Sequence, residues 1–149
     1  MKIPQRQRTW LYSAFSVLYF SGIWWCILRY LNPAERFYDD SQFLKTWSLK
    51  VHGAAAMLAL ILLGTLIPTH IKKGWLKGIN RLSGSVFIGV NVILIFTGYG
   101  LYYFGGEISR GIVHWLHIVL GIAFPGFLIG HILKGRSLQK SHLKKSIPK

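Results

Sequence analysis

The chain has 149 residues and a formal net charge of +14, from 18 basic and four acidic residues. Only 15% of the residues are charged, against roughly a quarter in an ordinary soluble domain, and most of this charge lies between long apolar runs. The pattern argues against a soluble domain. No nucleic-acid-binding motif accompanies the positive charge, so nucleic acid is not an expected partner.

The apolar runs predict an integral membrane protein that is all-α. A bilayer core of about 30 Å requires roughly 20 apolar residues of helix, and lipid excludes open strands because unpaired backbone groups are costly there. Short connections favour an up-down-up-down four-helix bundle in a single membrane domain spanning residues 1–149. The predicted spans are residues 10–31, 47–67, 82–104 and 112–133, followed by a basic tail at residues 134–149.

The distribution of charge predicts the orientation of these helices. Basic residues gather in the N-terminal segment, in the loop of residues 68–81 and in the tail, whereas Glu35, Asp39, Asp40 and Glu107 lie in the other two loops. By the positive-inside rule both termini are cytoplasmic. The expected protein is therefore multi-pass, surrounded by membrane lipid, and typical of a bacterial inner membrane.

Histidines within or beside the predicted spans occur on the second and fourth helices and not on the first and third. An ionisable residue at membrane depth marks a candidate functional site. In an α-helix of about 3.6 residues per turn, the 18 positions between His52 and His70 make five whole turns if the helix continues through Pro68. The 14 positions between His117 and His131 are about 40° short of four turns. Each pair therefore lies on one face of its helix.

Because the second and fourth helices are parallel in such a bundle, their histidines lie level with one another in pairs. Two facing imidazoles supply the axial nitrogens of a six-coordinate haem b, and two levels predict two haems. His52 pairs with His117 or His114 near the outer surface, and His70 pairs with His131 near the cytoplasm. Rotation around the helix axis favours His117 as the partner of His52, whereas the rise along the axis favours His114. If His114 is not a ligand, it could orient a haem propionate, a quinone or a neighbouring ligand.

Glycines on the third helix repeat the histidine spacing, since Gly84 and Gly98 are also 14 positions apart. Glycine leaves room for a porphyrin edge at two levels, which makes both residues candidate cofactor-binding positions. Small residues also mediate ordinary helix packing in membranes, and this remains the alternative interpretation.

The histidine-bearing segments resemble those of a known group. His117-IVLGIAFPGFLIG-His131 resembles the His-x13-His helix of the small four-helix b-type cytochromes of the cytochrome b561-like group, which includes the flavinylation-associated cytochromes. His52-GAAAMLALILLGTLIPT-His70 resembles the other ligand helix, although its spacing is longer. The resemblance implies bound haem b and electron exchange between a quinone pool or a cytoplasmic-side donor and a redox partner on the other face.

The expected function is that of an electron-transfer subunit with iron bound by His52, His70, His117 and His131. One alternative is a non-redox membrane transporter or assembly protein whose histidines handle protons or a metal ion. A proton relay, however, favours acidic residues, and no Asp or Glu lies inside any predicted span. A second alternative is a self-contained quinol-dependent reductase.

Overall fold

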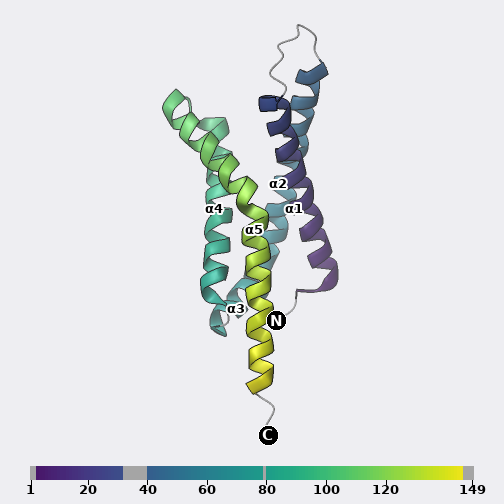
Figure 1. Cartoon of the computed structure of the whole chain (residues 1–149), viewed down its shortest axis with the longest axis vertical. Coiled ribbons are helices and arrows are strands. Elements are labelled where there is room, and N and C mark those ends of the chain that lie inside the picture. The colour runs from purple at the N-terminus through teal and green to yellow at the C-terminus, as the bar shows by residue number, and fades with distance from the viewer. Residues whose placement is uncertain (1–2, 32–39, 79, 146–149) are drawn as a thin grey trace. The chain divides into compact units, whose positions relative to one another are not determined.

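The computed structural model describes residues 3–31, 40–78 and 80–145, and this part of the chain is helical almost throughout and contains no strand (Figure 1). The predicted all-α class is therefore confirmed. The contacts divide the chain into two compact units, Met1–His70 and Ile71–Lys149.

The first unit is a helical hairpin. Helix α1 (Gln5–Cys26) ends in a π-helical turn, η1 (Ile27–Leu31), and packs against α2 (Asp40–Leu66). Two hydrogen bonds set the register: Gln7 Nε2 donates to Thr65 Oγ1 at 2.7 Å, and Ser48 Oγ donates to the carbonyl oxygen of Ser21 at 2.7 Å. Early residues of α1 thus lie beside late residues of α2, as in an antiparallel pair. Pro33, which follows the first predicted span in the sequence, lies outside the described residues.

The second unit consists of α3 (Lys72–Leu76), α4 (Arg81–Tyr103) and α5 (Glu107–Lys145), with α4 packed against α5. The turn into α4 uses two left-handed residues, Gly78 with φ +70° and Asn80 with φ 56°. Asn80 tolerates this region better than most residues with a side chain. Its Nδ2 donates to the carbonyl oxygen of His131 at 3.3 Å, which ties the start of α4 to α5.

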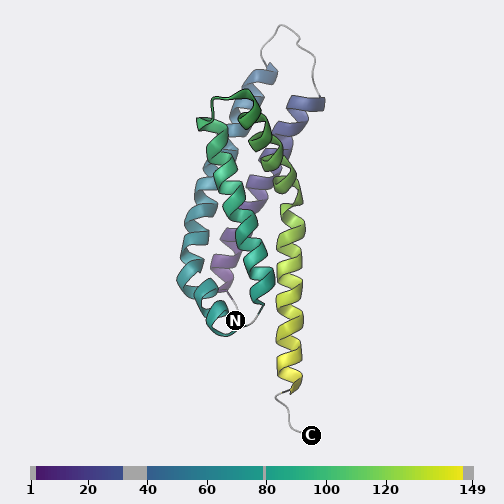
Figure 2. The same ribbon diagram turned by 90° about the vertical axis from the view of Figure 1, so that its left-hand side faces the viewer.

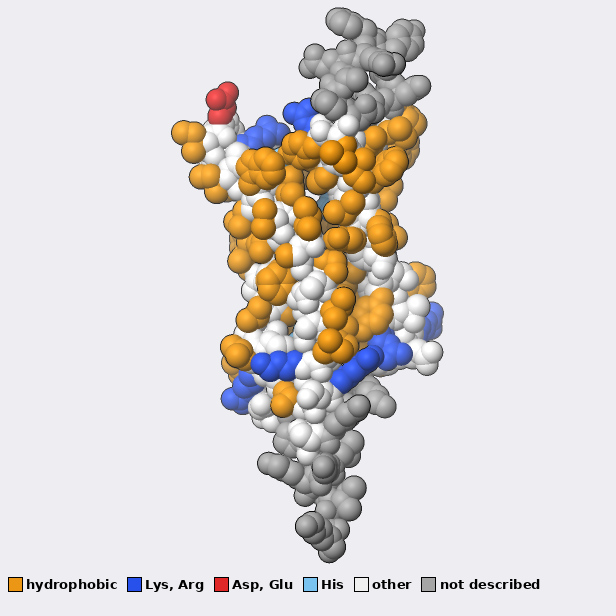
Figure 3. All heavy atoms as spheres, viewed as in Figure 1, with side chains coloured by type: hydrophobic (Ala, Val, Ile, Leu, Met, Phe, Trp, Pro, Cys, Tyr) orange, Lys and Arg blue, Asp and Glu red, His pale blue; other side chains and the backbone are white. Residues whose placement is uncertain are grey.

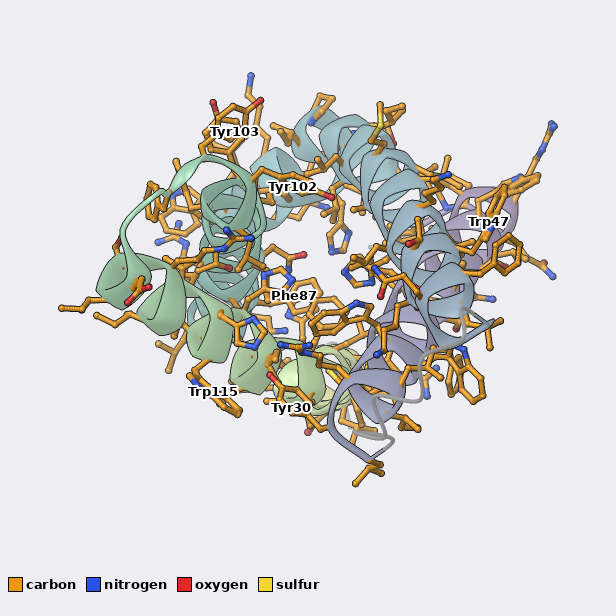
Figure 4. The ribbon with its side chains drawn as sticks, turned by 90° about the horizontal axis from the view of Figure 1, so that it is seen from above. Tyr30, Trp47, Phe87, Tyr102, Tyr103 and Trp115 are labelled. Atoms are coloured by element: carbon orange, nitrogen blue, oxygen red, sulfur yellow. The ribbon has the colours of Figure 1, made fainter. Side chains whose placement is uncertain are left out.

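Within the described residues, four helices are long and apolar enough to cross a membrane: Gln5–Leu31, Gln42–Leu76, Arg81–Tyr103 and Glu107–Leu138. By their length and composition the chain is a multi-pass membrane protein. Hydrophobic side chains cover the middle of the helices, and the visible charged side chains lie toward helix ends (Figure 3). Trp47 and Trp115 are 49% and 57% exposed and point outward from α2 and α5 (Figure 4). Lipid-facing apolar surface and interfacial tryptophans account for this exposure.

The structure extends three of the predicted helices: the first begins at Gln5, the second at Asp40 and the fourth at Glu107, and the second and fourth also end later than predicted. The second continues beyond Ile67 to Leu76, with Pro68 in a π-helical turn, η2 (Ile67–Ile71), because a wider turn accommodates a residue that lacks a backbone N–H. The fourth does not end at Leu133 but runs to Lys145, past the beginning of α4 (Figure 2). Hydropathy marks only the part of a helix in lipid, and lysine and arginine are good helix formers in water.

Helix α5 changes direction along its length (Figure 1). Pro125 lies inside it. A proline in this position cannot donate to the carbonyl four residues earlier, here that of Gly121, and its ring pushes against that carbonyl. The bend therefore has an identifiable cause in the sequence.

Candidate haem-ligand histidines

His52 of α2 is held by two acceptors on α1. Its Nδ1 lies 2.9 Å from the carbonyl oxygen of Leu18 and 3.2 Å from Ser21 Oγ. A carbonyl can only accept, and the Ser21 hydroxyl gives its own hydrogen to the same carbonyl at 3.1 Å. The hydrogen-bond network therefore assigns the proton of a neutral His52 to Nδ1. The ring then carries its lone pair on Nε2, the nitrogen that could bind a metal.

A glycine on α1 makes this close approach possible. A Cβ atom on Gly22 would lie 3.0 Å from His52 Cε1 and 3.2 Å from its Nδ1. Contacts of this length are tighter than nine in ten real Cβ contacts, so any larger residue at this position would require the ring to move by a few tenths of an ångström. Ser48 lies one turn before His52 on α2 and donates to the Ser21 carbonyl oxygen at 2.7 Å, which fixes the register at this level.

His117 of α5 repeats the arrangement against α4. Its Nδ1 lies 2.8 Å from Thr97 Oγ1, and Thr97 donates its own hydrogen to the carbonyl oxygen of Ile93 at 2.8 Å. The hydroxyl must then accept from the imidazole, so Nδ1 is again the protonated nitrogen. The next residue, Gly98, faces the same ring, since a Cβ atom there would lie 3.4 Å from His117 Cε1.

His131 of α5 has the same kind of contact with α4, a hydroxyl at Nδ1 and a glycine beside the ring, nearer the start of α4. Ser83 Oγ and His131 Nδ1 are joined by a hydrogen bond of 2.9 Å, and a Cβ atom on Gly84 would lie 3.8 Å from His131 Cε1. The ring of Phe87 stacks on the imidazole with centroids 5.5 Å apart and planes inclined by 11°. Figure 4 shows Phe87 among the side chains of this hairpin. The His131 ring is therefore fixed both at its edge and on its face.

These contacts share a sequence signature that the spacing of the histidines did not reveal. The chain contains three dipeptides in which Ser or Thr precedes Gly, and each lies against one histidine of the neighbouring helix. We call them hydroxyl–glycine pairs; they are Ser21-Gly22, Ser83-Gly84 and Thr97-Gly98. The hydroxyl meets Nδ1 and the glycine admits the ring. A search for Ser/Thr-Gly on the helices without histidine would have found all of them.

The two pairs on α4 match the two histidines on α5 in spacing. Ser83 and Thr97 are 14 positions apart, as are His117 and His131. In an antiparallel hairpin the earlier member of one pair meets the later member of the other, and the hydrogen bonds follow this order. At about 1.5 Å per residue, the two levels are about 21 Å apart along the helix.

Gly84 and Gly98 face the histidines of α5, and their predicted role beside a porphyrin stays a prediction. The sequence suggested room for a porphyrin edge, but each glycine faces an imidazole ring of α5. The physical reason lies in the antiparallel packing of α4 on α5, which turns both glycines toward the histidine-bearing face. The contact is close at Gly98, where a Cβ atom would lie 3.4 Å from the ring, and ordinary at Gly84, where the distance would be 3.8 Å.

His70 and His114 have other surroundings. His70 lies in the π-helical turn η2, which holds more residues per turn than an α-helix, so the five whole turns counted from His52 do not apply. His114 lies edge-on to Trp115, with centroids 5.6 Å apart and planes at 73°. It is three residues from His117, about 60° away around the helix. The Thr97-Gly98 pair contacts His117.

The hydrogen bonds of these histidines are those of imidazoles that could bind a metal through Nε2. Within the described residues no group of three or more His, Cys, Asp or Glu could hold a metal ion. A bis-histidine haem needs one imidazole nitrogen from each side, and a ligand imidazole characteristically donates its other N–H to an oxygen. In both His52 and His117, Nδ1 donates to an oxygen in this way. His117 and His131 are too far apart along α5 for one ion and belong to separate levels.

Comparison with protein-family models, with curated proteins and with solved structures gave no match. The functional assignment therefore depends on the residues and contacts of this chain.

Proposed function

We propose that the protein is a transmembrane b-type cytochrome with two haems, each held by two histidines. His52 and His117 bind the iron of the outer haem, and His70 and His131 bind that of the inner haem. The proposal is supported most strongly by one observation: two histidines on one face of α5, 14 positions apart, are each hydrogen-bonded at Nδ1 by a hydroxyl of α4.

The chain contributes orientation, protonation state and distance. A fixed Nδ1–H presents the basic Nε2 to an iron, and the close helix contact restricts rotation of the ring. Haem b supplies reversible one-electron oxidation and reduction at its iron when it is bound. Two levels separated by about 21 Å cover most of a hydrocarbon core of about 30 Å. This separation suits a path that carries electrons from one membrane surface to the other.

The proposed direction of insertion follows the charge distribution. Lys72, Lys73 and Arg81, with the basic residues beyond Lys134, would lie on the cytoplasmic side together with both termini. In a bacterial inner membrane the inner haem would then exchange electrons with a quinone or a cytoplasmic-side donor. The outer haem would serve a redox partner on the opposite face. The resemblance of the His117–His131 segment to cytochrome b561-like proteins supports the same role.

The proposal predicts electron transfer across a sealed membrane. Liposomes containing the haem-loaded full-length chain and trapped ferricyanide should show rapid ferricyanide reduction when dithionite is added outside, because neither ion crosses the bilayer. The measurement is the absorbance of the trapped ferricyanide over time. Reconstituted His131→Ala protein should be at least tenfold slower, since one ligand of the inner level is removed. Reduction by the wild-type chain at the rate of protein-free liposomes would contradict a conduit.

A further inference from the structure

We propose that Thr97 is a positioning residue whose hydroxyl lowers the reduction potential of the outer haem, and that Ser21 has no comparable effect. This inference rests on the proposed function, because it assigns a role toward a haem held by His52 and His117. It goes further by identifying which of two similar hydroxyls controls the redox property. The distinction comes from the different acceptors that hold the two imidazoles.

On the α5 side a side-chain hydroxyl accepts the imidazole proton. His117 Nδ1 is 2.8 Å from Thr97 Oγ1, and that hydroxyl in turn donates to the carbonyl oxygen of Ile93 at 2.8 Å. Consecutive hydrogen bonds in a low-dielectric interior polarise one another. Donation from Nδ1 makes Nε2 a stronger electron donor. A stronger axial donor favours ferric over ferrous iron, so the hydroxyl lowers the potential.

On the α2 side the main acceptor is part of the backbone. His52 Nδ1 lies 2.9 Å from the Leu18 carbonyl oxygen and 3.2 Å from Ser21 Oγ. Removing the Ser21 hydroxyl leaves the shorter of the two hydrogen bonds unchanged. The imidazole of His52 therefore keeps the Leu18 carbonyl as an acceptor in a Ser21 variant. The imidazole of His117 loses the Thr97 acceptor when that hydroxyl is removed.

Burial makes the Thr97 hydroxyl hard to replace. The side chain is only 5% exposed, so bulk water has little access to the position. The remaining hydrogen bonds of Thr97 are to carbonyls of its own helix, those of Ile93 and Leu94. These two bonds do not explain why a threonine lies opposite His117, since an apolar residue would need neither of them. The contact with the imidazole gives the hydroxyl a role.

The test is an optical redox titration of the purified, haem-loaded full-length chain. Thr97→Val keeps the shape of the side chain and removes the hydroxyl, whereas Thr97→Ser keeps the hydroxyl. In Thr97→Val we expect the ratio of reduced to oxidised outer haem at a fixed ambient potential to rise about tenfold, which is an upward shift of about 59 mV for a one-electron couple. Thr97→Ser should titrate as the wild type. The matched control Ser21→Ala should shift by less than a third of the Thr97→Val value.

Unchanged potentials in haem-loaded Thr97→Val, or an equal shift in Ser21→Ala, would overturn the inference and leave the proposed function intact. If Thr97→Val fails to retain the outer haem, the reduction potential of that haem in Thr97→Ser is decisive. A wild-type potential supports the role of the hydroxyl. A shifted potential overturns it. A folded wild-type chain that binds no haem would overturn the proposed function itself.

Discussion

The His117→Ala variant is expected to retain about one haem b per chain where the wild type retains two, whereas His114→Ala retains both. His117 is the histidine whose Nδ1 is held by Thr97 and whose ring lies against Gly98. His114 lies about 60° away around α5. Haem extracted from purified protein, divided by the protein concentration, measures the difference directly.

His114→Ala is a matched control because it removes the same side chain from the same helix, one turn away. His131→Ala should also leave one haem, and the spectrum of the haem that remains should differ from that in His117→Ala, since the two variants lose different levels. Loss of a haem from His114→Ala with two haems retained in His117→Ala would show that the outer ligand is misassigned. The Thr97-Gly98 pair would then have a role other than orienting a haem ligand.

The second large effect, on haem binding, is expected when Gly22→Ala adds one methyl group to α1. In Gly22→Ala the new Cβ atom would meet the His52 ring at 3.0 Å, and this ring is also held by the Leu18 carbonyl oxygen at 2.9 Å. The ring would have to shift by a few tenths of an ångström, which strains the hydrogen bond that orients it. We expect haem occupancy at the outer level to fall at least tenfold, within the range typical for loss of a group that orients a metal ligand. Helix content by circular dichroism should stay unchanged.

The other hydroxyl–glycine pairs provide a graded series for the same measurement. The corresponding distances to the histidine ring are 3.4 Å at Gly98 and 3.8 Å at Gly84, so Gly98→Ala should lose less haem than Gly22→Ala, and Gly84→Ala the least. Gly64→Ala is the control, since nothing lies within 4 Å of a Cβ atom there. Equal haem content in Gly22→Ala and Gly64→Ala would show that the approach of His52 to α1 does not matter for binding.

The sequence predicted the helical class, the four spans and the pairing of histidines on one face of α5. These features depend on hydropathy and on the regular period of a single helix, which are properties of a segment by itself. The 14-residue spacing of His117 and His131 could be interpreted without knowing what lies opposite. Charge likewise suggested an orientation that remains a prediction.

Other features depend on how one helix faces another, and they could not be predicted from single segments of sequence. Ser21, Ser83 and Thr97 look like ordinary small residues of membrane helices until the antiparallel register brings each one to an imidazole. The π-helical turn at Pro68 changes the phase of His70, which a regular α-helical period cannot describe. The extension of α5 beyond Leu133 was missed because hydropathy falls where the helix leaves the apolar region, while the helix itself continues.

The central claim is that this chain binds two haems b through paired histidines. The most direct test is the haem content and absorption spectrum of the full-length protein purified from haem-replete cells. The account predicts two haems per chain, with a sharp α band of the b type on reduction and no covalent attachment. A folded, fully helical protein that is colourless would contradict it.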